Sequence, residues 1–83
     1  MYFTFTESAV KDVRRLPIQT QRALQTKLRY WQGHADPLHF AKPLMKHRAA
    51  THRFRFGVYR ILVMTTGDEL RILRVRHRRE VYQ

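Results

Sequence analysis

The stretch THRFRFGVYRILV, residues 51–63, determines the fold and raises the question of function. Arginine and aromatic residues alternate before Gly57-Val58, as in a strand with one buried face. A glycine in the first position of a two-residue loop favours a type II′ β-hairpin. In that register Arg55 opposes Arg60, and directly opposed residues share a face of the sheet. The stretch therefore predicts a hairpin with Arg53, Arg55 and Arg60 on one face and apolar side chains on the other.

The segments around this hairpin predict the remaining elements. Residues 2–6 alternate aromatic and polar side chains, which is typical of a strand, whereas residues 6–16 change to helical spacing. A second helix is expected over residues 17–33, with proline at its start and glycine at its end. One short edge strand is expected near residues 40–45, and a last strand over residues 70–76.

These elements predict an α+β domain over residues 1–83. An N-terminal strand is followed by an antiparallel two-helix hairpin and then by an antiparallel β meander, with the helices packed on one face of the sheet. Hydrophobic residues make up 43% of the 83-residue chain, enough for one modest core. The face that carries the arginines would remain open to solvent.

Net charge is the property that points most directly to a partner. Seventeen Lys and Arg residues face six Asp and Glu residues, a formal charge of +11, whereas a magnitude of roughly 2 to 8 is enough for solubility. No acidic residue lies between Asp36 and Asp68, so an anionic ligand would relieve the repulsion between Arg55 and Arg60. The charge therefore favours a nucleic acid or an acidic protein as partner. A solvated charged face is the alternative interpretation.

Several classes of protein are excluded or disfavoured by what the sequence lacks. The absence of cysteine removes disulfides and thiolate metal sites, and the five histidines show no metal-ligand spacing. We therefore expect neither a metal nor a cofactor. No apolar run reaches the roughly 18 residues of a membrane span, and the N-terminus lacks the basic start of a signal peptide. A cytoplasmic protein without membrane contact is expected.

The tail RVRHRREVY, residues 74–82, adds side chains suited to phosphodiester chemistry. Cleavage of RNA by its own 2′-hydroxyl needs a base, cations that stabilise charge on the phosphate, and an acid for the leaving oxygen. Arginine stays charged and can act only electrostatically, whereas His77 and Tyr82 can move protons. A frayed basic terminus with a surface histidine is the alternative interpretation.

Three segments resemble the RelE/ParE superfamily of bacterial toxins from type II toxin-antitoxin systems. They are FTESAVKDVRRLP (5–17), KPLMKHRAATHRFRFGVYRILV (42–63) and RILRVRHRREVY (71–82). The resemblance implies a RelE-like fold. It also implies that RelE-type members are ribosome-dependent mRNA endonucleases, which cut in the ribosomal A site by attack of the substrate 2′-hydroxyl and so inhibit translation.

The resemblance also implies roles for individual residues. Arg53, Arg55, Arg60 and Arg78 would position the phosphate and stabilise its charge, and Tyr82 would transfer a proton or stack on a base. Lysines of one subgroup are arginines here, so the base is either Tyr82 or His77. Further RNA-binding cations are expected at Lys42, Lys46, Arg48, Arg76 and Arg79.

The implied partners are a cognate antitoxin, mRNA in the ribosomal A site and 16S rRNA, with operator DNA bound only through the antitoxin complex. The antitoxin should be acidic, or should offer an amphipathic segment that covers the sheet and its cations. Two rival functions remain. ParE-type members inhibit DNA gyrase without cutting nucleic acid, although the HR and VY of the tail favour the nuclease. A degenerate basic domain without activity is the other.

Overall fold

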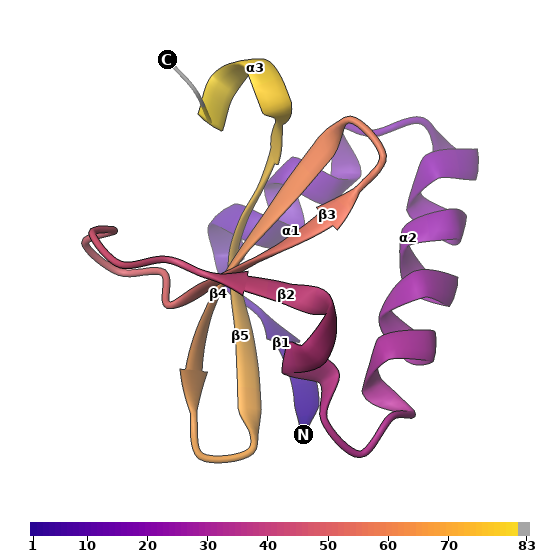
Figure 1. Ribbon diagram of the computed structural model, residues 1–83. Helices are drawn as coiled ribbons and strands as arrows, with labels where there is room; N and C mark the ends of the chain where they lie inside the picture. Colours follow the sequence, from indigo (N-terminus) through magenta and orange to yellow (C-terminus); the bar gives the residue numbers. More distant parts are fainter. Residues whose placement is uncertain (82–83) are drawn as a thin grey trace.

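The computed structural model describes residues 1–81, and Figure 1 shows the arrangement of its elements. In chain order they are β1 (Tyr2–Phe5), α1 (Glu7–Arg14), α2 (Ile18–Gln32), the 3₁₀ helix η1 (Pro37–Phe40), β2 (Ala41–Pro43), β3 (His52–Phe56), β4 (Tyr59–Thr66), β5 (Glu69–His77) and α3 (Arg78–Val81). This order confirms the predicted α+β fold class. No helix within these residues is long and apolar enough to cross a membrane.

The five strands form one sheet in the order β1-β5-β4-β3-β2. Strands β2 to β5 make the predicted antiparallel meander. The prediction did not include the position of β1, which pairs in parallel with β5 at one edge. The two helices carry the chain across the sheet to β2 at the opposite edge, and the meander then returns it to β5 beside β1.

The hairpin between β3 and β4 has the predicted register. Phe56 pairs with Tyr59 and Arg55 with Arg60. Gly57 has a φ of +57°, whereas no residue other than glycine within 1–81 has a positive φ. A positive φ at the first loop position alone is the signature of a type II′ turn, so the turn type is also confirmed.

A β-bulge in β5 changes which residues face the helices. Leu62 pairs with Arg74, but Val63 pairs with Ile72, which leaves Leu73 as the extra residue. The Leu73 carbonyl accepts a hydrogen bond from the Thr6 hydroxyl at 2.9 Å. Because of the bulge, the next buried residue after Ile72 is Val75 and not Arg74.

The helices cover one face of the sheet, as predicted (Figure 1). Helix α1 is capped by Thr6, whose hydroxyl accepts a hydrogen bond from the Ala9 amide at 3.1 Å. Leu24, Leu28 and Trp31, spaced along one face of α2, are buried. They pack on the sheet with Phe54, which has no exposed surface and lies 4.7 Å from the Trp31 ring, centroid to centroid.

A buried carboxylate joins α1 to β5. Asp12 accepts hydrogen bonds from Arg74 Nε at 2.8 Å, from Arg74 Nη2 at 3.0 Å and from the Val75 amide at 2.9 Å. Burial by itself would raise the pKa of Asp12, but these hydrogen bonds outweigh it and the pKa is lowered. The bonds hold the outer half of β5 in place next to the residues that carry the candidate site.

Candidate functional site

Cationic side chains from four strands meet on the face of the sheet that the helices leave open. Arg53 is paired with Lys42 of β2, and Arg60 is paired with Arg55 of β3 and Arg76 of β5. Because paired residues share a face, the expected grouping of Arg53, Arg55 and Arg60 is confirmed. These three arginines, Lys42 and the segment 39–41 line a cleft of about 400 Å³.

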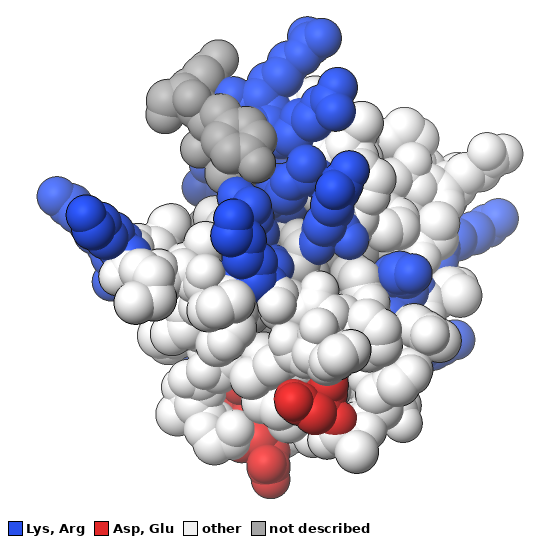
Figure 2. All heavy atoms as spheres, in the orientation of Figure 1, with Lys and Arg blue, Asp and Glu red and all other residues white. Residues whose placement is uncertain are grey.

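On the face of the molecule that Figure 2 shows, lysine and arginine side chains are concentrated in one region. In Figure 2 lysine and arginine side chains gather over the upper half of the view, which in Figure 1 contains α3 and the β3–β4 hairpin. The acidic side chains in view lie at the lower end. A polyanion approaching the open face therefore meets positive charge that is little opposed by acids.

Arg60 is the buried member of the group, with 7% of its surface exposed. Its Nη1 donates hydrogen bonds to the carbonyl oxygens of Gly57 at 2.9 Å and Tyr59 at 3.0 Å, so the type II′ turn fixes the guanidinium. These acceptors are neutral. No carboxylate within residues 1–81 forms an ion pair with Arg60 or with Arg55 opposite it. The expected like-charge conflict is therefore present and is not neutralised by the described chain.

A second hollow of about 240 Å³ adjoins the first and shares Arg53 with it. Its other lining residues are Leu44, His47, Leu62, Arg76 and Glu80. His47 Nδ1 accepts hydrogen bonds from the Ala49 amide at 3.1 Å and the Ala50 amide at 2.9 Å. In the neutral ring this places the proton on Nε2, which is then a hydrogen-bond donor.

Glu80 is the carboxylate of this second hollow. It accepts hydrogen bonds from the His77 amide at 3.2 Å and from Arg76 Nε at 2.8 Å. The His77 amide and then Arg76 lower the pKa of Glu80, so the group is ionised near neutral pH. The sequence prediction missed His47 and Glu80. The i, i+4 spacing of Arg76 and Glu80 was the available signal, but it is informative only if β5 leads directly into α3.

Two predicted catalytic residues are not brought to either hollow. His77 pairs with Tyr59 and lies with it on the helix-covered face, where the two rings are 5.9 Å apart in an edge-to-face arrangement. Its Nδ1 accepts a hydrogen bond from the Arg79 amide. Arg78 is the first residue of α3 and is exposed, and its amide donates to the Val58 carbonyl at 2.7 Å. The β5 cation at the site is Arg76, which the sequence prediction had placed among the RNA-binding residues.

The remaining predicted residues have varied positions. Lys42 lines the cleft, whereas Lys46 and Arg48 are exposed on the loop between β2 and β3, and Arg79 is exposed on α3. Tyr82 lies outside the described residues. Within residues 1–81, His, Asp and Glu nowhere gather into a group of three that could hold a metal ion.

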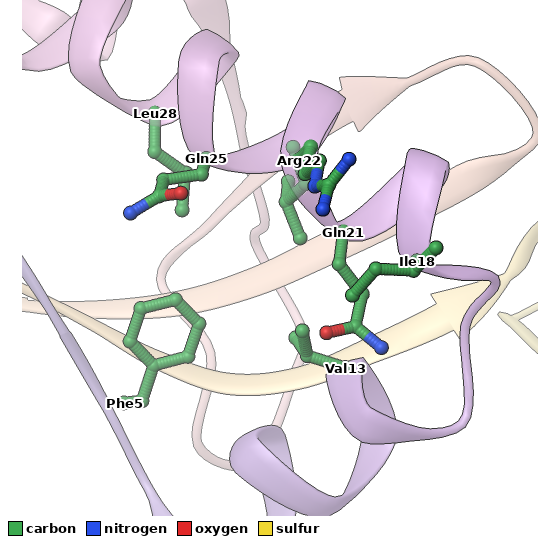
Figure 3. A pocket seen from close by; sticks show the side chains of 8 residues that line it. Phe5, Val13, Ile18, Gln21, Arg22, Gln25 and Leu28 are labelled. Carbon is green, nitrogen blue, oxygen red and sulfur yellow. The ribbon is translucent and has the colours of Figure 1, made fainter.

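A largely apolar groove lies on the helix-covered side and shares no lining residue with the cationic cleft. Figure 3 shows Phe5 of β1 and Val13 of α1 facing side chains of α2 across a hollow of about 330 Å³. Phe5 is 42% exposed and Ile18 is 59% exposed. Gln21, Arg22 and Gln25 supply its polar atoms, so the groove suits an amphipathic segment better than a polyanion.

Comparison of the sequence with protein families gives one match. Residues 3–82 match the family described as the ParE toxin of the type II toxin-antitoxin system parDE. No curated protein matches the chain in sequence.

Two solved structures share the fold. The chain is similar to a chain of the toxin-antitoxin complex RelBE2 from Mycobacterium tuberculosis, with 31% identity over 92% of this chain and 95% of that one and a TM-score of 0.77. It is also similar to a chain of the RelB-RelE antitoxin-toxin complex from Methanococcus jannaschii, with 24% identity over 95% and 94% of the two chains and a TM-score of 0.73.

Proposed function

Since the chain belongs to the ParE toxin family, within the RelE/ParE superfamily of type II toxin-antitoxin systems, we propose that this toxin is a ribosome-dependent mRNA endonuclease. It cuts by attack of the substrate 2′-hydroxyl without a metal and so inhibits translation in the cytoplasm. The observation that carries the proposal is the pair of adjoining hollows, which share Arg53 and are lined by Arg55, Arg60 and Arg76.

The arginines supply the electrostatic part of the reaction. In this step the 2′-oxygen bonds to phosphorus, the bond to the 5′-oxygen breaks, and a 2′,3′-cyclic phosphate forms while the 2′-proton passes to a base and the leaving oxygen takes up a proton. Arg53 and Arg55 match the non-bridging oxygens with their planar donor pairs, and the fixed guanidinium of Arg60 stabilises the added charge. The preorganised position of Arg60 avoids reorganisation during the step.

Proton transfer falls to side chains other than arginine. Glu80 is an ionised carboxylate in the second hollow and can accept a proton, although its lowered pKa makes it a weak base. His47 offers Nε2–H to a phosphate or leaving oxygen. Tyr82 would transfer a proton or stack on a base, as the resemblance implies. Lys42 binds the backbone next to the scissile phosphate, and Lys46, Arg48 and Arg79 extend the positive surface toward mRNA and 16S rRNA.

One observation favours a second function. The matching family is described by its ParE toxin, and a ParE-like toxin would inhibit DNA gyrase without cutting. Such an inhibitor needs a surface for gyrase but no groups that transfer protons next to a cationic cleft. The presence of His47 and Glu80 beside Arg53 and Arg76 is the reason to prefer the nuclease.

A single induction experiment separates the two functions. After the chain is expressed from an inducible promoter, new mRNA 5′ ends should appear within coding regions in phase with codons, while supercoiling by purified gyrase with added toxin stays unchanged. Treatment with an initiation inhibitor should abolish the cuts, because no A site is then presented. Inhibited supercoiling without new 5′ ends would establish the gyrase inhibitor instead.

The apolar groove is proposed as a binding site for the cognate antitoxin. Toxins of this class have such a partner, and the two similar complexes contain an antitoxin. With a net charge of +11, the toxin favours an acidic antitoxin, whose amphipathic segment would place apolar side chains against Phe5 and Ile18. Operator DNA is then bound through the complex and not by the toxin alone.

Replacing Ile18 with aspartate should weaken antitoxin binding about tenfold, because an ionised carboxylate would be buried in an apolar interface. Titration calorimetry with the purified antitoxin measures the change. Gln19→Asp adds the same charge one residue away, outside the residues that line the groove, and should bind normally. Equal losses in both variants would attribute the effect to charge alone and would remove the groove from the interface.

A further inference from the structure

One end of the cationic cleft is aromatic. His39 and Phe40, the last two residues of η1, line it together with Arg53, Arg55 and Arg60. The two rings lie edge to face with their centroids 5.5 Å apart. The cleft therefore offers ring surface and guanidinium groups to the same ligand.

These two rings belong to a larger aromatic cluster. Phe40 contacts Tyr30 at 5.7 Å and His34 at 4.8 Å, and the Tyr30 and His34 rings are 4.7 Å apart. Phe40 also packs against the hydrophobic core, whereas His39 and Tyr30 are exposed. The ring of His39 is therefore held beside the cleft by a neighbour that is anchored in the core.

Core packing explains Phe40 but not the exposure of His39 next to three arginines. A phosphate alone would use only the guanidinium groups and Lys42. A nucleotide of a single strand carries a phosphate and a base with a flat face, and single-stranded RNA is recognised by stacking such bases on aromatic side chains. The composition of the cleft matches both parts of a nucleotide.

We propose that His39 and Phe40 form a nucleobase subsite at the end of the cleft, so that the toxin binds one base of its RNA substrate together with the adjacent phosphate. The subsite rests on the proposed endonuclease function and adds to it a means by which the protein itself selects the base. The phosphate is held by Arg55 and Lys42, and the base lies against the ring of His39.

Binding of a short single-stranded RNA with 2′-O-methyl riboses, which cannot be cut, tests the subsite by fluorescence polarisation. Removing the base at one position of this RNA should weaken binding to the wild-type toxin about tenfold, since stacking contributes on that scale. His39→Gln should weaken binding of the intact RNA about tenfold and should show no further loss with the abasic RNA. His39→Phe keeps a ring without ring nitrogens and should retain the abasic penalty.

His34→Ala is the matched control, because His34 belongs to the cluster but does not line the cleft. It should bind intact and abasic RNA as the wild type does. Inorganic pyrophosphate should compete equally well against all variants, since the cations are unchanged. An abasic penalty that persists in His39→Gln, the absence of a penalty at every position, or failure of the intact RNA to bind would each overturn the subsite.

These outcomes separate the subsite from the nuclease proposal. If mRNA is cut in cells but the losses of RNA affinity from His39→Gln and from removal of the base are additive, the subsite is wrong and the nuclease proposal is retained. If no mRNA is cut but the losses are coupled, the toxin binds a nucleotide in the cleft without cleaving it.

Discussion

Replacing Arg53 with glutamine is expected to lower the rate of mRNA cutting by about 100-fold or more. Arg53 is the residue that both hollows share, so under the proposed function it would contact the phosphate in the cleft and also adjoin the groups that are proposed to transfer protons. Removing a preorganised donor that faces developing negative charge typically costs 10² to 10³ in rate. Single-turnover cleavage on ribosomes programmed with a defined mRNA measures the change.

The control for Arg53→Gln is Arg71→Gln. Arg71 pairs with Met64 and lies on the same open face, but it is exposed and lines neither hollow. The two variants lose the same charge, so a general electrostatic effect would slow both equally. We expect Arg71→Gln to cut within about threefold of wild type. Equal losses would show that net charge, and not the position of Arg53, drives the reaction.

The central hairpin could be predicted from the sequence because local signals agree there. Alternation fixed the faces of β3, and Gly57 fixed the loop length and hence the pairing of Arg55 with Arg60. The burial of Arg60 could not be predicted in the same way. It depends on the turn carbonyls and on cover from distant segments, which no short-range pattern describes.

The side chains of β5 show where strict alternation between the two faces of the sheet fails. Leu70 and Ile72 are buried, so strict alternation would turn Arg76 toward the helices and His77 toward the cleft. The bulge at Leu73 reverses this order beyond it. The adjacent apolar pair Ile72-Leu73 and the following apolar Val75 were the signal in the sequence. The same reversal brings Arg76 to the second hollow, whereas the prediction had assigned the catalytic role to Arg78.

The remaining site residues come from segments with no regular pattern. His47 lies on the loop between β2 and β3, and Glu80 lies on a helix of four residues. Loops position side chains through tertiary contacts and through local bonds such as those to His47 Nδ1. Because these segments have no regular spacing, the sequence shows which residue types they contain but does not predict that the residues lie together in space.

Asp12→Asn should lower the free energy of unfolding by about 2 kcal/mol and the melting temperature by roughly 10 °C. Asp12 is 8% exposed and accepts three hydrogen bonds, two of them from Arg74, and an amide cannot accept all of them. The side chain of Arg74 is 40% exposed, so water can replace part of the hydrogen bonding that Arg74 loses. The loss of stability is therefore smaller than for a fully buried ion pair. Thermal and urea unfolding followed by circular dichroism give both values.

The pH dependence identifies the carboxylate as the cause. The folded state lowers the pKa of Asp12 below its usual value of 3.8, so the stabilisation is fully present above that value and is lost as the pH falls through the lower folded pKa. The stability difference between wild type and Asp12→Asn should therefore be constant near neutral pH and shrink below about pH 4. Glu7→Gln alters an exposed pair with Lys11 and should change stability by less than about 0.5 kcal/mol. A difference for Asp12→Asn that stays constant down to pH 2 would mean that packing, and not the charge on Asp12, joins α1 to the strand carrying Arg76.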